Sequence, residues 1–205
     1  MRKFITDPKV EVIGVSALAV IQNLNMEEME PILTKYHLTV IEPDQWYPFQ
    51  LHLDIFREIA EGRTNSIENL VAIGMKAAQL APLPPQIKTF EDMLHNYNAA
   101  YRMTIRNQSP QEGFLIEFLG DGHAHITNNT PIPDDMTFGA FWGFAQRLLR
   151  RNTNFLIQPL KRVPPESDES TTFDVTWDAG FVKPAPSLRS SDKNFIAVQN
   201  AADAR

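Results

Sequence analysis

Apolar residues recur at helical spacing through most of the first hundred residues of the chain. This spacing predicts five helices, because each apolar stripe would cover a core while the opposite face of the helix meets water. Polar capping residues mark the start of several of these helices. The predicted helices begin at Ser16 and after Asn25, and then cover residues 49–61, 65–80 and 89–104.

After residue 112 the apolar period changes to two, which is typical of strands. The glycine-rich turn over 120–122 joins the first two strands as a hairpin. This order predicts a sheet that forms late in the chain and is covered by helices, with a pocket between the two layers. The predicted strands cover residues 113–119, 123–127, 155–160 and 171–177, and one more helix runs from Asp134 or Asp135 to about Arg151.

The apolar positions of the strands are expected to lie buried beneath the helices. They are Phe114, Ile116, Phe118, Phe155, Ile157, Phe173, Val175 and Trp177. A length of 205 residues suits one domain. We expect a single domain over residues 10–180, with a flexible N-terminus over 1–9 and a flexible C-terminal tail over 181–205 that is rich in Pro, Ser, Ala and Asp.

The composition excludes several classes of function. With 43% apolar and 21% charged residues, the chain has the balance of a soluble globular protein. The net charge of −6 opposes binding to a nucleic-acid backbone, and the absence of cysteine excludes disulfides, thiolate nucleophiles and cysteine-based metal sites. The apolar run over 10–20 is too short and too interrupted to span a bilayer, so we expect a cytoplasmic protein.

The histidines are the remaining candidates for chemistry, because the chain has no phosphate-binding glycine loop, Ser-His-Asp arrangement or His-Glu-x-x-His motif. His95 lies roughly 100° or more from the apolar stripe of its helix, which favours an exposed position. His52 falls within an apolar stripe and is interpreted as a buried, hydrogen-bonded core residue. His123 and His125 have the spacing of a metal-binding pair, but their alternation with apolar neighbours favours a solvated pair, and we expect no metal site.

Aromatic side chains on three helices predict a shared ligand pocket. Gly139 and Gly143 thin the late helix, and large rigid rings beside glycines can leave a concave surface. In the alternative interpretation the same rings fill the core, and the tyrosine hydroxyls bond to backbone or solvent. The six residues predicted to line the pocket are Phe56, Leu94, Tyr97, Tyr101, Phe141 and Trp142.

Several local motifs match the pattern of one known family. They are Gly14 before a weak helix, Trp46-Tyr47-Pro48, Val71-Ala72-Ile73-Gly74 and the closing Thr172-Phe173-Asp174-Val175-Thr176-Trp177. In these motifs the chain resembles a bacterial family of unknown function in the superfamily of haem nitric-oxide/oxygen-binding (H-NOX) and 4-vinyl reductase domains. The resemblance implies an α+β fold, in which a helical layer packs on a four-stranded antiparallel sheet and a small-molecule or tetrapyrrole pocket lies between them.

The resemblance makes haem the cofactor to consider. An H-NOX domain holds haem through a proximal histidine on the helix before the sheet and through a Tyr-x-Ser-x-Arg motif that binds the propionates. His95 falls close to the proximal position and is the candidate haem ligand. Where the second motif should lie, residues 127–133 read Thr-Asn-Asn-Thr-Pro-Ile-Pro, so the charge-assisted clamp is missing and haem is disfavoured.

These features favour a non-catalytic ligand-binding or sensor domain with an apolar pocket between helices and sheet. The alternative is a structural or protein-interaction module with a filled core. The expected partners are a small apolar ligand and either a second copy of the chain or a signalling protein, and neither nucleic acid nor a membrane is expected.

Overall fold

The computed structural model describes residues 3–21, 26–38, 40–61, 66–160 and 170–178. The predicted flexible tail over 181–205 lies outside these residues. The helices are α1 (Gly14–Ile21), α2 (Met26–Lys35), α3 (Phe49–Glu61), α4 (Ser66–Leu80), α5 (Phe90–Thr104) and α6 (Asp134–Leu148). The strands are β1 (Glu11–Ile13), β2 (Trp46–Pro48), β3 (Ile105–Arg106), β4 (Gly113–Gly120), β5 (His123–Asn129), β6 (Phe155–Pro159) and β7 (Thr171–Trp177).

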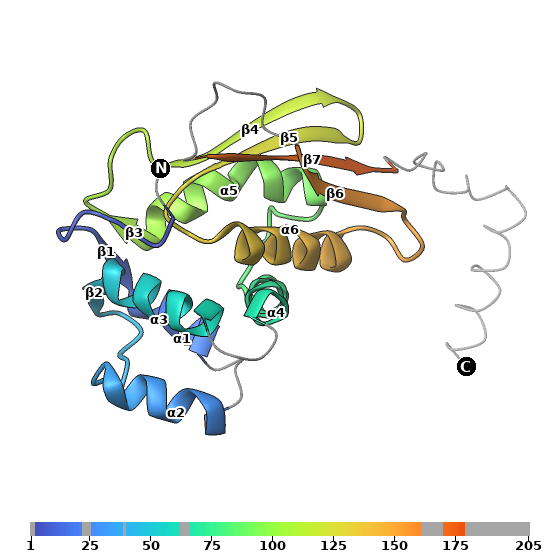
Figure 1. Ribbon diagram of the computed structural model, residues 1–205. Coiled ribbons are helices and arrows are strands. Elements are labelled where there is room, and N and C mark those ends of the chain that lie inside the picture. Colours follow the sequence, from blue (N-terminus) through green and yellow to red (C-terminus); the bar gives the residue numbers. More distant parts are fainter. Residues whose placement is uncertain (1–2, 22–25, 39, 62–65, 161–169, 179–205) are drawn as a thin grey trace, which may run out of the picture.

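A four-stranded sheet in the order β4-β5-β7-β6 forms the second half of the chain, and all three of its strand pairs are antiparallel. Helix α5 contacts β4 and helix α6 contacts β6. Figure 1 shows both helices beneath the same face of the sheet, while no described helix covers the other face. The predicted α+β fold, with a helical layer on a four-stranded antiparallel sheet, is therefore confirmed.

A second, small sheet in the order β2-β1-β3 was not predicted. Its central strand places Glu11 opposite both Pro48 and Arg106, so it joins three distant parts of the chain. Strands of two or three residues are too short to show an alternating pattern. The small sheet fixes where α3 begins, because β2 runs directly into that helix.

The helices form a second level beneath the sheet. Helix α4 packs against α6, and α1 and α3 pack against α4. Thr89 begins α5 with a reciprocal capping box, in which its hydroxyl accepts from the Asp92 amide and the Asp92 carboxylate accepts from the Thr89 amide. In the described part of the chain, no helix has both the length and the apolar character needed to cross a membrane.

The two faces of the large sheet differ strictly in character. Along β5 and β7, buried and half-exposed residues alternate over seven positions each. Because this period matches the pleat, β5 and β7 turn a mostly apolar face to the helices and a polar face to solvent, while the outer strands add exposed leucines such as Leu115 and Leu156 to the open face. Of the predicted core residues, Phe114, Ile157, Phe173, Val175 and Trp177 are buried, and Ile116, Phe118 and Phe155 are half-buried at the margins.

Glycines allow α4 and α6 to cross at very short range. A Cβ atom on Gly139 would collide with the backbone carbonyl of Val71, and one on Gly143 would lie 2.5 Å from the carbonyl oxygen of Met75. On the facing helix, a Cβ atom on Gly74 would collide with the backbone of Met136. The Gly-x-x-x-Gly pair therefore serves helix–helix packing, with a third glycine opposite it.

Arg147 fixes the end of this crossing. Its Nη1 atom donates to the carbonyl oxygens of Ala78, Gln79 and Ala81 at 3.0, 3.1 and 2.7 Å. These carbonyls lie at the carboxyl end of α4, where they lack helical partners and where the helix dipole favours a cation. Arg147 thus caps one helix from the next, while α6 itself ends at Leu148 rather than at the predicted Arg151.

Replacing Phe173 by Ala is expected to lower the free energy of unfolding by about 3–5 kcal/mol, because the ring is 2% exposed and its loss leaves a cavity. Chemical denaturation of the purified variant measures this change. Leu156→Ala is the matched control, since Leu156 lies on the open face and is 50% exposed. An equal effect of both substitutions would contradict the assignment of the two faces.

Gly139→Ala is expected to destabilise the protein by about 1–3 kcal/mol, because the added methyl group forces α4 and α6 apart. Gly120→Ala is the control, because nothing lies within 4 Å of a Cβ atom at that position. Thermal unfolding of the two variants compares them directly. Equal melting temperatures would show that the crossing tolerates a wider separation.

Candidate functional site

An aromatic cluster occupies the space between α5, α6 and β4. The Tyr97 ring lies 4.6 Å from that of Phe141 and 4.8 Å from that of Phe114, measured between centroids. Tyr101 lies one turn further along α5 and meets Phe114 edge-on at 5.4 Å. The structure therefore brings together three of the predicted pocket residues, Tyr97, Tyr101 and Phe141, through a ring supplied by the sheet.

The other predicted pocket residues lie around this cluster. Leu94 is fully buried on α5. Trp142 faces Phe155 at 4.8 Å, and Phe56 makes its ring contact with His52 on α3 at 6.4 Å. Neither of these two shares a ring contact with Tyr97 within the described residues. A single pocket formed by all six side chains remains a prediction.

Tyr101 leads from the aromatic cluster to a buried carboxyl group. Its hydroxyl donates to Glu112 Oε1 at 2.5 Å, and Glu112 is only 2% exposed. Burial raises the pKa of Glu112, while the hydrogen bond from Tyr101 and the charge of Arg102 act in the opposite direction. Burial and the adjacent Glu112 carboxylate also raise the pKa of Tyr101, so its hydroxyl remains a donor.

A cleft of about 550 Å³ opens beside Glu112. One wall is the amino-terminal segment that contains Ile5 and Lys9, and the other is the loop over 107–110. Arg102 holds this loop by donating from Nη2 to the carbonyl oxygens of Pro110 and Glu112 at 2.7 and 2.6 Å. Sequence reasoning missed the cleft, because two irregular segments that are far apart in the chain carry no periodic signal.

His52 is the most unusual polar residue of the helical layer. It lies on the buried face of α3, is 4% exposed, and neither of its ring nitrogens has a hydrogen-bond partner among the described residues. The predicted burial is correct, but the predicted hydrogen bonding is wrong. Burial lowers the pKa of His52 to about 4, so the imidazole is neutral and carries one unmet donor and one unmet acceptor.

His95 is exposed on α5, and its ring stacks on Phe118 of β4 with centroids 4.2 Å apart and planes inclined at 27°. One face of the imidazole is therefore covered by the sheet. The histidine lies at the margin of the layer, away from the buried stripe that contains Leu94 and Tyr101.

A closed polar network fills the turn between β5 and α6. The amide of Asn128 donates to Asp134 Oδ1 at 2.9 Å and to Thr137 Oγ1 at 3.0 Å, and its oxygen accepts from the hydroxyl of Thr130 at 2.7 Å. Lys3 binds the carbonyl oxygen of Thr130 and forms an ion pair of 3.0 Å with Asp134. Asn128, Thr130 and Thr137 are all buried, so this network is satisfied from within.

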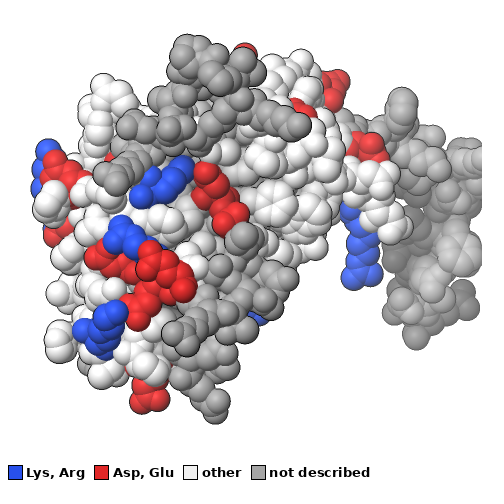
Figure 2. All heavy atoms as spheres, in the orientation of Figure 1, with Lys and Arg blue, Asp and Glu red and all other residues white. Residues whose placement is uncertain are grey.

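The strand histidines lie elsewhere, on the open face of the sheet. His123 and His125 are half-exposed and both approach Asp174 of β7. Figure 2 shows Lys and Arg side chains next to Asp and Glu side chains on the visible face of the molecule. The ion pairs of the described residues include Lys35 with Glu58 at 2.7 Å and Arg57 with Asp54 at 3.2 Å.

The chain resembles known proteins in its structure but not in its sequence. No protein-family model and no curated protein sequence matches the chain. An H-NOX protein from S. oneidensis in its Fe(II)NO ligation state matches over 80% of this chain and 98% of its own, with 12% identity and a TM-score of 0.60. The oxygen complex of an H-NOX domain related to soluble guanylate cyclases covers 86% and 96%, with 12% identity and a TM-score of 0.58.

A third neighbour, a single-site variant of Tt H-NOX, has 13% identity and a TM-score of 0.59, with 86% of this chain and 96% of that chain covered. Almost the whole length of each neighbour is therefore matched. At this identity the likeness concerns the path of the backbone. The chain has an H-NOX-like fold.

Acid should destabilise the wild-type protein partly through His52. Its folded pKa of about 4 lies below the ordinary 6.5, so the unfolded chain binds the proton first and stability falls as the pH drops between these values. The loss is about 3 kcal/mol at pH 4. The His52→Leu variant should not show this loss of stability between pH 7 and pH 4, and urea unfolding at the two pH values measures it. His37→Asn is the control, because His37 is exposed. The same dependence of stability on pH in wild type and His52→Leu would refute this role of His52.

Proposed function

We propose that the chain is a non-catalytic ligand-binding or sensor domain that takes a small, largely apolar molecule between its helical layer and its sheet. The observation that carries this proposal is the buried imidazole of His52 on α3, for which the described part of the chain offers no hydrogen-bond partner. Leaving a buried polar group unmet costs about 1–3 kcal/mol. A ligand with a hydroxyl or similar group would supply the missing hydrogen bond.

The surroundings of His52 define the chemistry of the ligand. On the same face of α3, Leu53 and Phe56 are 0% and 4% exposed. Closer to the sheet, Tyr97 of α5 and Phe141 of α6 form an aromatic cluster of their own, with ring centroids 4.6 Å apart. Binding sites for small organic molecules combine apolar walls with a few polar groups that orient the ligand. Such a site favours a neutral, aromatic or aliphatic molecule with one hydrogen-bonding group.

Haem held as in the nitric-oxide sensors does not fit the residues that are present. The candidate proximal residue, His95, is exposed and stacked on Phe118. In the segment where the resemblance implies a propionate clamp, Asn128 and Thr130 bond to each other, and the nearby cation of Lys3 is paired with Asp134. A propionate would have to displace these bonds, so we place no haem in the proposed function.

Two neutral probes of nearly equal shape test the proposal. Naphthalene measures the apolar site, and 1-naphthol adds one hydroxyl group. We expect both probes to raise the melting temperature of the wild-type protein. His52→Leu should bind 1-naphthol about two- to tenfold more weakly than wild type, the value of one net hydrogen bond, and should bind naphthalene unchanged.

The other outcomes are equally informative. Equal weakening of both probes in His52→Leu would contradict the polar role of His52. Binding of neither probe would favour the alternative, a structural or protein-interaction module with a filled core. Haem is the remaining competitor: a Soret band on titration with haem that disappears in His95→Ala would overturn the proposal.

A further inference from the structure

The open face of the large sheet carries a row of polar side chains that crosses all four strands. Glu117 of β4 is paired with His125 of β5, His125 with Asp174 of β7, and Asp174 with Gln158 of β6. Residues opposite each other on one face of a sheet have neighbouring side chains. His123 lies two positions before His125 on β5 and therefore joins the same face.

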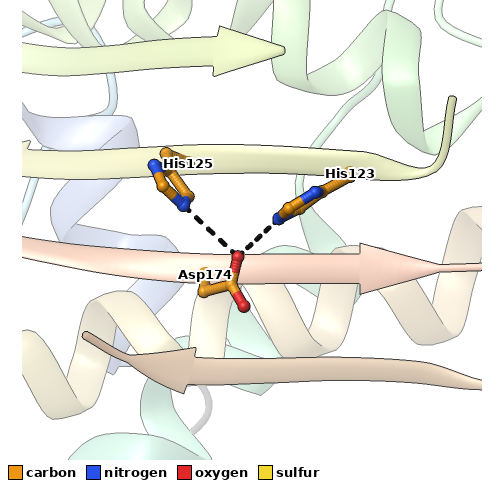
Figure 3. A group of neighbouring side chains, drawn as sticks. All are labelled: His123, His125 and Asp174. Carbon is orange, nitrogen blue, oxygen red and sulfur yellow. Dashed lines mark hydrogen bonds and ion pairs between the residues drawn. The ribbon is translucent and has the colours of Figure 1, made fainter. Parts of the chain in front are cut away.

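Three of these side chains converge on one point. Nε2 of His123 lies 2.6 Å from Oδ1 of Asp174, and Nε2 of His125 lies 3.4 Å from the same oxygen. Figure 3 shows the two imidazole rings directed toward this oxygen from β5, with the carboxylate rising from β7 between them. The three candidate ligand atoms all lie within 4.8 Å of one another.

We propose that His123, His125 and Asp174 bind a divalent transition-metal ion, with Zn²⁺ as the reference ion, on the sheet face opposite to the helices. The proposal does not depend on the ligand pocket, because the two sites lie on opposite sides of the sheet. It also revises the expectation from the sequence of a solvated histidine pair without metal.

The separations suit an ion after a small adjustment of side chains. Zinc bonds of about 2.0–2.1 Å in a tetrahedral arrangement place the ligand atoms about 3.3 Å apart. The distance of 3.4 Å from His125 to Asp174 already has this value, and the hydrogen bond of 2.6 Å from His123 would open by less than about 1 Å. Three protein ligands leave at least one coordination position for water or another small ligand.

The carboxylate is oriented by a further side chain. Gln158 donates from Nε2 to Oδ2 of Asp174 at 3.3 Å, which leaves Oδ1 to face the histidines. Outer hydrogen bonds of this kind hold metal ligands in position.

The partial burial of the three residues also favours a site. Their side chains are 38%, 31% and 18% exposed for His123, His125 and Asp174, so each is held by its neighbours while an ion can reach it from solvent. Two imidazoles and one carboxylate select zinc, cobalt, nickel, copper or iron(II) over Mg²⁺ and Ca²⁺, which prefer oxygen ligands. A bound ion would connect the neighbouring strands β5 and β7.

Titration calorimetry of the full chain without an affinity tag tests the site with Zn²⁺ alone. We expect one ion per chain, at least tenfold weaker binding in each of His123→Ala, His125→Ala and Asp174→Asn, and a smaller loss in Gln158→Ala. His37→Asn is the control, because His37 is exposed and lies outside the site. Mg²⁺ should give no heat of binding at the same concentrations.

Two further measurements distinguish the loss of the metal site from a loss of folding in the variants. Zinc at about one hundred times the wild-type dissociation constant should raise the melting temperature of wild type by roughly 5–10 °C, and that of Asp174→Asn by at most about half as much. Cobalt(II) should show visible absorption bands in wild type that are lost in a folded Asp174→Asn variant. No zinc binding by wild type, or binding that survives all three ligand substitutions, would overturn the proposal.

Discussion

The strict two-residue period of β5 and β7 is the constraint on which the rest of the molecule depends. Ala124 and Ile126 point to the helices, and His123 and His125 between them point away. The opposite strand has Phe173 and Val175 on the covered face and Asp174 on the open one. A shift of one residue in either strand would exchange the faces, so the hydrophobic core sets the register that brings Asp174 to the histidines.

The covered face in turn depends on how closely the helices approach one another. Gly74, Gly139 and Gly143 let α4 and α6 cross with backbone against backbone, and Arg147 of α6 caps the end of α4. This crossing connects the sheet-bound helix to the helices of the first half of the chain. Phe141 lies on α6 and packs against Tyr97 of α5, so its position depends both on the crossing with α4 and on the contact with α5.

The sequence predicted the elements that have a periodic pattern of apolar residues, and it missed the features that depend on tertiary contacts. Helical and alternating patterns located α3 to α6 and the four long strands, since apolar burial dictates both. The small sheet, the cleft beside Glu112 and the partner of the strand histidines were not predicted. Asp174 belongs to one of the motifs that resemble the known family. It lies 49 positions after His125, so no local sequence pattern indicates that the two residues are neighbours.

The burial of His52 lowers the stability of the fold, and it is also the basis of the proposed function. A leucine of similar size would satisfy the same apolar face of α3 without an unmet donor and acceptor. A penalty of about 1–3 kcal/mol is a sizeable part of a net stability of about 5–15 kcal/mol. The network around Asn128 shows that the same fold satisfies its buried polar groups elsewhere. Among the described residues the imidazole of His52 therefore stands out as an unsatisfied polar group, and this is the observation on which the proposed ligand rests.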